Sequence, residues 1–225
     1  MSQTTLSPLI SYPKQAAFGR VLPKNKIYEH SGVSPAVREM FVRQVEQIVW
    51  QFKLATETIN LASKPGVPEL QIFTIQLKTP TLNHEVLRCI DSAVQFPIIF
   101  ELTFEGRIQV VAAFKRPSES DNNRWVVSDY FSTQWMPNES ARLAMPLALD
   151  LGVLYELLLK RLIPLPLRQN ETLAELVRRV ELLRLKENEV QKIISKLNKE
   201  KQFNRKVEIN AQLRAIRQEL ENLTN

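Results

Sequence analysis

The alternation of apolar and polar residues divides the chain into a mixed α+β body and a helical tail. Ser34 and Pro35 suit the start of a helix, because Ser accepts from free backbone N–H groups and Pro fits the first helical position. The apolar residues that follow at helical spacing are Val37, Phe41, Val45, Ile48 and Phe52. The spacing predicts one helix over residues 34–54.

The next segments predict a sheet. Residues 69–78 alternate as in a strand, and residues 82–94 return to helical spacing. Residues 97–104 and 107–116 are expected to form two strands around a tight turn at Glu105–Gly106, since Gly accepts the positive φ of such turns. Residues 124–135 predict a third strand. This order favours the α+β fold class, with a small, mainly antiparallel sheet and packed helices.

Prolines suggest the domain limits. Residues 1–33 contain three of them and little periodicity, which predicts an N-terminal extended arm. The body is expected over 34–163 and ends with a helix over 141–160 that carries Leu at 143, 147, 151, 154 and 158. Pro164 and Pro166 cannot continue that helix, so residues 164–170 are interpreted as a Pro-rich linker.

The tail, residues 171–225, contains no Gly or Pro and shows two heptad-like apolar seams. The first consists of Leu176, Val180, Leu183, Val190, Ile194 and Leu197, and the second of Ile209, Leu213, Ile216, Leu220 and Leu223. The seams are out of phase, which favours an antiparallel helical hairpin (coiled coil) over one continuous helix. The corner is expected at Lys199–Arg205, with Phe203 capping the apolar seam. Self-association of the tail as a coiled-coil dimer is an alternative.

Composition narrows the class of protein. With 44% hydrophobic and 24% charged residues, the chain is typical of a globular protein. The net charge of +6 favours acidic partners such as nucleic acid as much as a merely solvated basic surface. Cys89 is the only cysteine, which excludes an internal disulfide and favours a reducing compartment. The start shows no secretory signal and no stretch is long and apolar enough for a membrane span, so we expect a cytoplasmic protein.

The search for catalytic chemistry gives one alternative. The five glycines are scattered singly, and His30, His84 and Cys89 lack metal-ligand spacing, so neither metal nor cofactor is expected. Asp91, Glu101 and Lys115 occur in the order of a Mg²⁺-dependent nuclease, whose carboxylates hold the metal beside a lysine. Ala113 stands where such a nuclease would carry another acid. We therefore prefer a non-catalytic protein and keep the nuclease as the alternative.

Basic and aromatic residues predict two nucleic-acid contacts. In the body, Trp125, Tyr130, Phe131 and Trp135 share a strand, and the nearby cations are Lys115, Arg116 and Arg124. Aromatic rings can stack on bases, although burial in a core is their commoner use. In the tail, the candidate cations are Lys199, Lys201, Arg205 and Lys206.

Several segments together resemble a known family. They are "FVRQVEQIVWQFKLATETINL", "FPIIFELTFEGRIQVVAAFKR", "DYFSTQW", "LPLALDLGVLYELLLKRLIPLP" and "EKQFNRKVEINAQLRAIRQEL". In this order they resemble the bacterial domain-of-unknown-function family numbered 4391, whose members are typically encoded near DNA helicases, DNA methyltransferases and restriction or phage-defence components. The resemblance implies an accessory protein of a restriction-modification or antiviral defence system, acting by protein–protein interaction with a larger helicase or methyltransferase. It assigns no catalytic residue.

Overall fold

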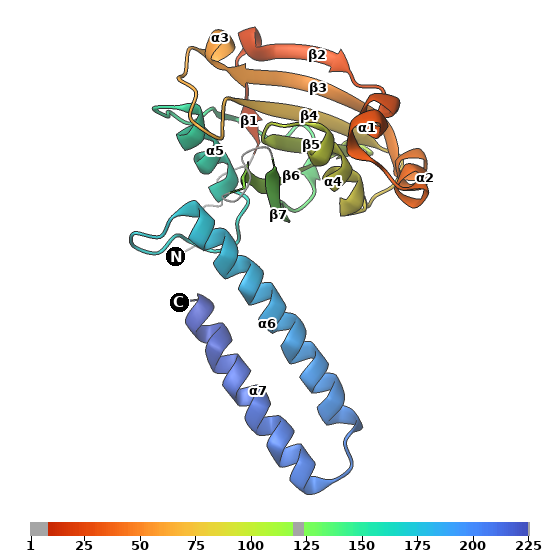
Figure 1. Cartoon of the computed structure of the whole chain (residues 1–225), viewed down its shortest axis with the longest axis vertical. Helices are drawn as coiled ribbons and strands as arrows, with labels where there is room; N and C mark the ends of the chain where they lie inside the picture. The colour runs from red at the N-terminus through yellow and green to blue at the C-terminus, as the bar shows by residue number, and fades with distance from the viewer. Residues whose placement is uncertain (1–8, 119–123, 225) are drawn as a thin grey trace. The chain divides into compact units, whose positions relative to one another are not determined.

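The computed structural model describes residues 9–118 and 124–224 (Figure 1). The chain divides into two compact units, Met1–Leu162 and Ile163–Asn225, and each is considered by itself. Residues 1–8 of the expected arm and residue 225 of the expected hairpin lie outside the described residues.

The first unit is built on a mixed sheet of seven strands, counted over the described residues. Six of them lie in the order β2 (Ala17–Val21), β3 (Val45–Ala55), β4 (Glu69–Leu77), β5 (Ile98–Phe104), β6 (Arg107–Pro117) and β7 (Trp125–Ser132), and β8 (Met136–Pro137) also pairs with β6. Among the described strands of this sheet, only β4 and β5 run parallel to each other, and helix α4 (His84–Ala93) joins them. The prediction of an α+β fold with a mainly antiparallel sheet is confirmed.

The strands β4 to β7 and the helix α4 match the predicted segments closely. The turn between β5 and β6 uses Glu105 at φ 45° and Gly106 at φ 72°, the positive values expected of a tight hairpin. A short helix α3 (Thr56–Ile59) and a two-stranded parallel sheet of β1 (Ile10–Ser11) and β9 (Leu143–Ala144) complete the strand connections.

The predicted helix over 34–54 is wrong in its second half. Helix α2 spans Pro35–Gln44 and leads directly into strand β3. Two bulges in β3 each place an extra residue opposite β4, the first of them between Val45 and Gln47. A bulge shifts the alternation by one residue, so Val45 and Ile48 point into the same core although they are three apart. This spacing imitates a helix in the sequence.

The expectation of a merely extended N-terminal arm is also wrong for residues 9–33. They form β1, the 3₁₀ turn Lys14–Ala16, edge strand β2 and helix α1 (Lys24–Ser31). Ile27 of α1 is 2% exposed and belongs to the main core. Lys24 Nζ donates to the carbonyls of Phe41 at 3.1 Å and Val45 at 2.6 Å, which fixes the end of α2. The segment therefore extends the sheet, which is larger than predicted.

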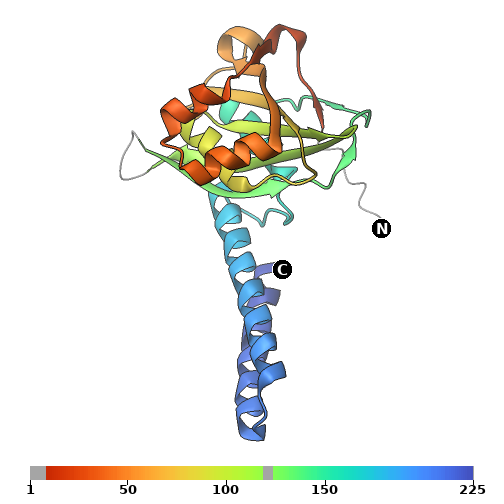
Figure 2. The ribbon, with the colours of Figure 1, turned by 90° about the vertical axis from the view of Figure 1, so that its right-hand side faces the viewer.

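Helices cover both faces of the sheet. Helices α1, α2 and α4 share one core with the inward residues of β3 to β6, and Figure 2 shows α1 and α2 in front of the sheet. Helix α5 (Leu151–Lys160) lies on the other face, since Phe114 stacks on Tyr155 of α5 at 6.3 Å while neighbouring Ala113 points into the first core. The predicted helix over 141–160 is thus too long. Asp150 begins the helix by accepting from Val153 N at 2.8 Å, and Leu147 is 98% exposed.

The second unit consists of helices α6 (Leu173–Lys199) and α7 (Phe203–Thr224). Their contact cluster contains Val190, Leu213 and Ile216, with Ile193, Ile194, Leu197 and Leu220 packed against it. Arg179 donates to Leu223 O at 2.9 Å, so the beginning of α6 lies beside the end of α7 and the helices run in opposite directions (Figure 1). Coiled-coil geometry in the strict sense stays a prediction. The placement of Phe203 in the seam is wrong, because its side chain is 77% exposed.

Candidate nucleic-acid interface

The structure joins two of the three nuclease candidates in a buried cluster. The Lys115 ammonium donates to Asp91 O at 2.5 Å, to Asp91 Oδ1 at 3.4 Å and to Val94 O. The Tyr130 hydroxyl donates to Asp91 Oδ2 at 2.6 Å. These bonds occupy all three ammonium protons and both carboxylate oxygens, so the cluster holds the carboxyl end of α4 against β6.

Burial decides what this cluster can do. Asp91 is 4% exposed and Lys115 is 1% exposed. Burial raises the pKa of the Asp91 carboxyl, while the Lys115 ammonium and the Tyr130 hydroxyl oppose that rise. Burial likewise lowers the pKa of Lys115. A phosphate cannot reach Lys115, so its predicted role in nucleic-acid binding is wrong.

Glu101 lies on the opposite face of the sheet from Asp91 and Lys115. Its neighbours Phe100 and Leu102 point into the core that contains α4, which turns Glu101 away from it. The Glu101 carboxylate accepts from Arg142 Nη1 at 2.7 Å and Nη2 at 3.0 Å, and Arg142 also donates to Ile10 O. The structure therefore does not assemble Asp91, Glu101 and Lys115 into one metal site.

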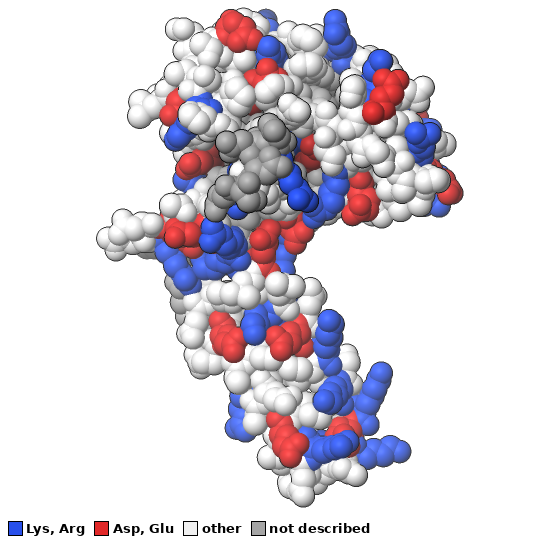
Figure 3. Space-filling model, in the orientation of Figure 1, with Lys and Arg blue, Asp and Glu red and all other residues white. Residues whose placement is uncertain are grey.

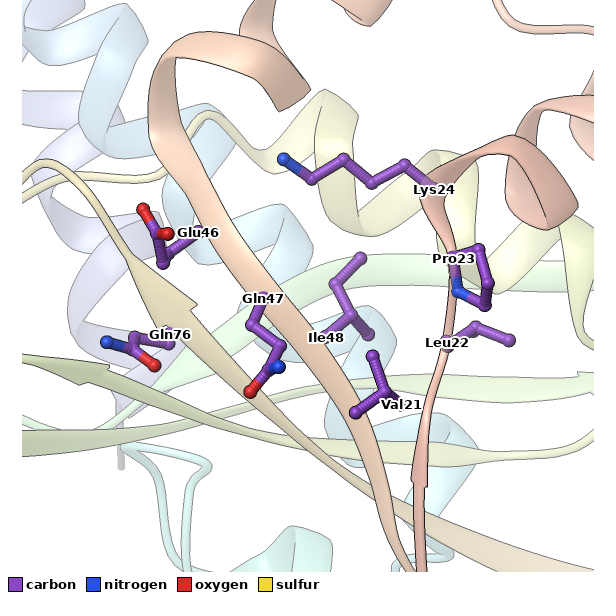
Figure 4. Close-up of a pocket in the computed structure, with 8 residues that line it drawn as sticks. All are labelled: Val21, Leu22, Pro23, Lys24, Glu46, Gln47, Ile48 and Gln76. Carbon is purple, nitrogen blue, oxygen red and sulfur yellow. The ribbon is translucent and has the colours of Figure 1, made fainter.

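The body has hollows in which polar groups meet. Glu101 and Arg142 line one of about 400 Å³, beside Tyr12, whose pKa is raised by burial. A second, of about 450 Å³, lies where β2 leaves the sheet; its lining is drawn in Figure 4. There Lys24 is engaged in fixing the end of α2. Among the residues that the structure describes, no three His, Cys, Asp or Glu side chains are close enough to hold a metal ion.

The remaining body candidates flank the connection between β6 and β7. Arg116 is half-buried near the end of β6, and exposed Arg124 immediately precedes β7. The aromatic residues of this region mostly serve the fold, since Tyr130 is 4% exposed and Phe131 is fully buried. The core interpretation of this aromatic strand therefore agrees with the structure.

The tail candidates gather at one end of the second unit. We define the basic tip as Lys192, Lys196, Lys199, Lys201, Arg205 and Lys206, which belong to the last turns of α6, the connection and the first turn of α7. Every one of these side chains is exposed. Figure 3 shows Lys and Arg side chains projecting from this end of the tail. Lys192 and Lys196 were not predicted from the sequence, although their spacing with Lys199 places the three on one helical face.

Within the described part of the chain, none of the tip cations forms a salt bridge, since no carboxylate lies within 4 Å of any of them. Between residues 190 and 207 there are six Lys or Arg residues and one acid, Glu200, which gives +5 of the total net charge of +6. One oxygen of that carboxylate, Glu200 Oε1, accepts from Lys201 N at 2.8 Å and from Gln202 N at 2.9 Å. These two bonds, and to a smaller extent the charges of Arg205 and Lys206, lower the pKa of Glu200.

Further along the hairpin some of the cations are paired. Lys186 contacts Glu189 at 3.3 Å and Glu219 at 2.7 Å. Arg179 binds the Glu171 carboxylate at 2.7 Å and holds the pKa of that group at about 2. The helix dipole gives two of the tip cations a structural role. Lys196 and Lys199 lie in the last turn of α6, where positive charge complements the negative end of the dipole. Arg205 and Lys206 gain nothing from a helix dipole, since they lie in the first turn of α7, at its positive end.

The comparisons with known proteins identify the family. The sequence model of a family described as "Domain of unknown function (DUF4391)" matches residues 10–220. The chain belongs to this family. The match covers both units of the structure and confirms the resemblance seen in the sequence segments. Comparison with the curated proteins and with the solved structures gives no match. No helix among the described residues is long and apolar enough to cross a membrane.

Proposed function

We propose that this protein is a non-catalytic accessory protein that binds the phosphate backbone of nucleic acid through the basic tip. The observation that carries the proposal is the group of six exposed cations without a carboxylate partner in the described structure, within a segment of charge +5. Cations that stabilise a fold are normally paired or buried, as Arg179 and Lys115 are here. Unpaired cations attract polyanions, because binding releases condensed counterions.

Two further expectations belong to the proposal. The family resemblance suggests that the protein acts beside a helicase or DNA methyltransferase of a restriction or defence system, with the body docking on that partner. The nuclease alternative is not favoured by the geometry, since Glu101 faces away from Asp91 and Lys115. A plasmid incubated with the protein and Mg²⁺ or Mn²⁺ is expected to remain uncut.

Salt dependence tests the binding itself. If six cations each neutralise one phosphate, the logarithm of the affinity for a single strand should fall with the logarithm of salt at a slope of about −4. The affinity should then drop roughly 300-fold between 50 and 200 mM salt. Fluorescence anisotropy with a labelled oligonucleotide of about 20 nucleotides measures both quantities.

A matched pair of variants locates the site. The triple substitution Lys199→Gln, Lys201→Gln and Arg205→Gln should reduce the slope to about −2. The control Lys14→Gln, Lys26→Gln and Arg43→Gln removes the same charge from exposed positions of the body and should leave the slope nearly unchanged. Equal losses in the two variants, or no binding by the native protein at 50 mM salt, would defeat the proposal.

A further inference from the structure

Phe203 is the feature of the tip that phosphate binding leaves unexplained. It is the first residue of α7 and is 77% exposed, whereas Phe18, another exposed aromatic residue, is 40% exposed and contacts the Trp50 ring at a tilt, with 4.2 Å between the ring centroids. The apolar contacts between the helices are made by other residues, including Leu213 and Ile216. The ring thus contributes little to the hairpin and remains in water, where a large apolar side chain is unfavourable.

The neighbours of Phe203 indicate what covers the ring. Lys201 precedes it by two residues, and Arg205 and Lys206 follow by two and three; all three are exposed. An exposed aromatic ring in a segment of exposed cations combines the two elements that bind single strands, a stacking platform for a base and positive charges for the adjoining phosphates. A duplex offers the same phosphates, but its bases are already stacked on one another.

We propose that Phe203 stacks on an unpaired base, so that the basic tip is a site for single-stranded nucleic acid, either free or beside a duplex. This inference rests on the proposed function, since the cations must first bring a backbone to the tip. It adds the class of ligand: a nucleic acid with at least one base outside a double helix. DNA and RNA share this chemistry.

An anionic membrane surface is a poorer match to the tip. A helix that lies in a membrane interface needs a continuous apolar face. Among the described residues of α7, the large exposed hydrophobic side chains are Phe203 and Val207, while Ile209, Leu213 and Ile216 are buried. One ring and one valine cover too little area for such binding, but they suffice for one base.

Substitutions at Phe203 test the inference by anisotropy on a single strand and a duplex of the same sequence, each as DNA and as RNA. Phe203→Ala should weaken single-strand binding about 5- to 150-fold, the range that 1–3 kcal/mol of stacking gives, and leave duplex binding unchanged. Phe203→Trp should keep single-strand affinity. Phe203→Leu, apolar but not aromatic, should lose as much as Phe203→Ala. Val207→Ala is the control and should have no effect.

A base analogue reports the contact directly. The fluorescence of 2-aminopurine in the single strand should be quenched by the native protein and by Phe203→Trp, but not by Phe203→Leu. Three results would overturn the inference: equal losses on strand and duplex, full affinity of Phe203→Leu, or binding to anionic lipid vesicles that Phe203→Ala abolishes. A different result would contradict the proposed function: the absence of salt-dependent binding to both the single strand and the duplex.

Discussion

Replacing Lys115 by Met should destabilise the body strongly and make its stability depend on pH. Met has nearly the length of the Lys side chain and carries no charge, so the packing volume is nearly kept. The ammonium bonds to Asp91 and Val94 are lost. The buried Asp91 carboxylate, 4% exposed, then keeps the hydrogen bond from the Tyr130 hydroxyl and the more distant charge of Arg88.

The expected loss of unfolding free energy depends on whether the Asp91 carboxylate stays ionised or takes up a proton. Removing one partner of a buried ion pair costs about 3–5 kcal/mol of unfolding free energy. Asp91 can avoid remaining charged by taking up a proton, which costs about 4 kcal/mol at pH 7 for a group of ordinary pKa near 3.9, and about 1.5 kcal/mol at pH 5. The loss of the ammonium raises the pKa of Asp91 in the folded variant further above its unfolded value. The folded state then holds the extra proton, so the deficit should shrink by about 2.5 kcal/mol as pH falls from 7 to 5.

Urea denaturation followed by tryptophan fluorescence measures this deficit in the body, because all three tryptophans belong to the first unit. The double variant Asp91→Asn with Lys115→Met leaves no charge in this cluster and should lose this pH dependence. Lys26→Met, at an exposed position, is the control and should change stability by less than about 0.5 kcal/mol. The reasoning is refuted if Lys115→Met costs less than about 1 kcal/mol at pH 7, or costs the same at pH 5 and pH 7.

Three further substitutions test other contacts. Tyr155→Phe removes the hydroxyl that donates to Ala113 O and accepts from Lys115 N, both at 2.8 Å, and should cost about 1–3 kcal/mol in the same urea assay. Glu171 has its pKa lowered to about 2, so its contribution to the stability of the hairpin is complete above its ordinary pKa and is lost as pH falls toward 2. Glu171→Gln should therefore reduce the loss of helical circular dichroism in acid. Leu213→Ala, at a position 6% exposed, should destabilise the hairpin by about 2–3 kcal/mol and speed amide exchange across both helices, whereas exposed Leu185→Ala should not.

Local patterns predicted the elements of this protein wherever the backbone was regular. Alternation found β4 to β7, and the phase slip between the two seams anticipated a break after Lys199, where α6 ends. The failures have local causes. The bulges of β3 give Val45 and Ile48 the spacing of a helix. Leu147 continues the spacing of the leucines in α5, but it lies before Asp150, where that helix begins.

The candidate site needed contacts that no sequence pattern supplies. Asp91, Glu101 and Lys115 follow one another in a plausible order, but the direction in which each side chain leaves its element separates Glu101 from the other two. Phe203 shows the reverse case. Its position near a heptad seam predicts a seam residue, whereas the structure leaves it 77% exposed and available for another role. Periodicity indicates which residues are apolar, but not whether a partner covers them.

The placement of the excess charge favours a localised function over a generally basic surface. A solvated basic surface would distribute the net charge of +6 over the chain, yet residues 190–207 carry +5 and the remaining residues together only +1. Cations elsewhere are frequently paired or buried, as Lys186, Arg179 and Lys115 are. Clustering like charges in this way raises their mutual repulsion, and neither salt bridges nor burial offsets it in the described tip. A bound polyanion would offset this repulsion. Relief of the repulsion should therefore contribute favourably to the free energy with which the tip binds a polyanion.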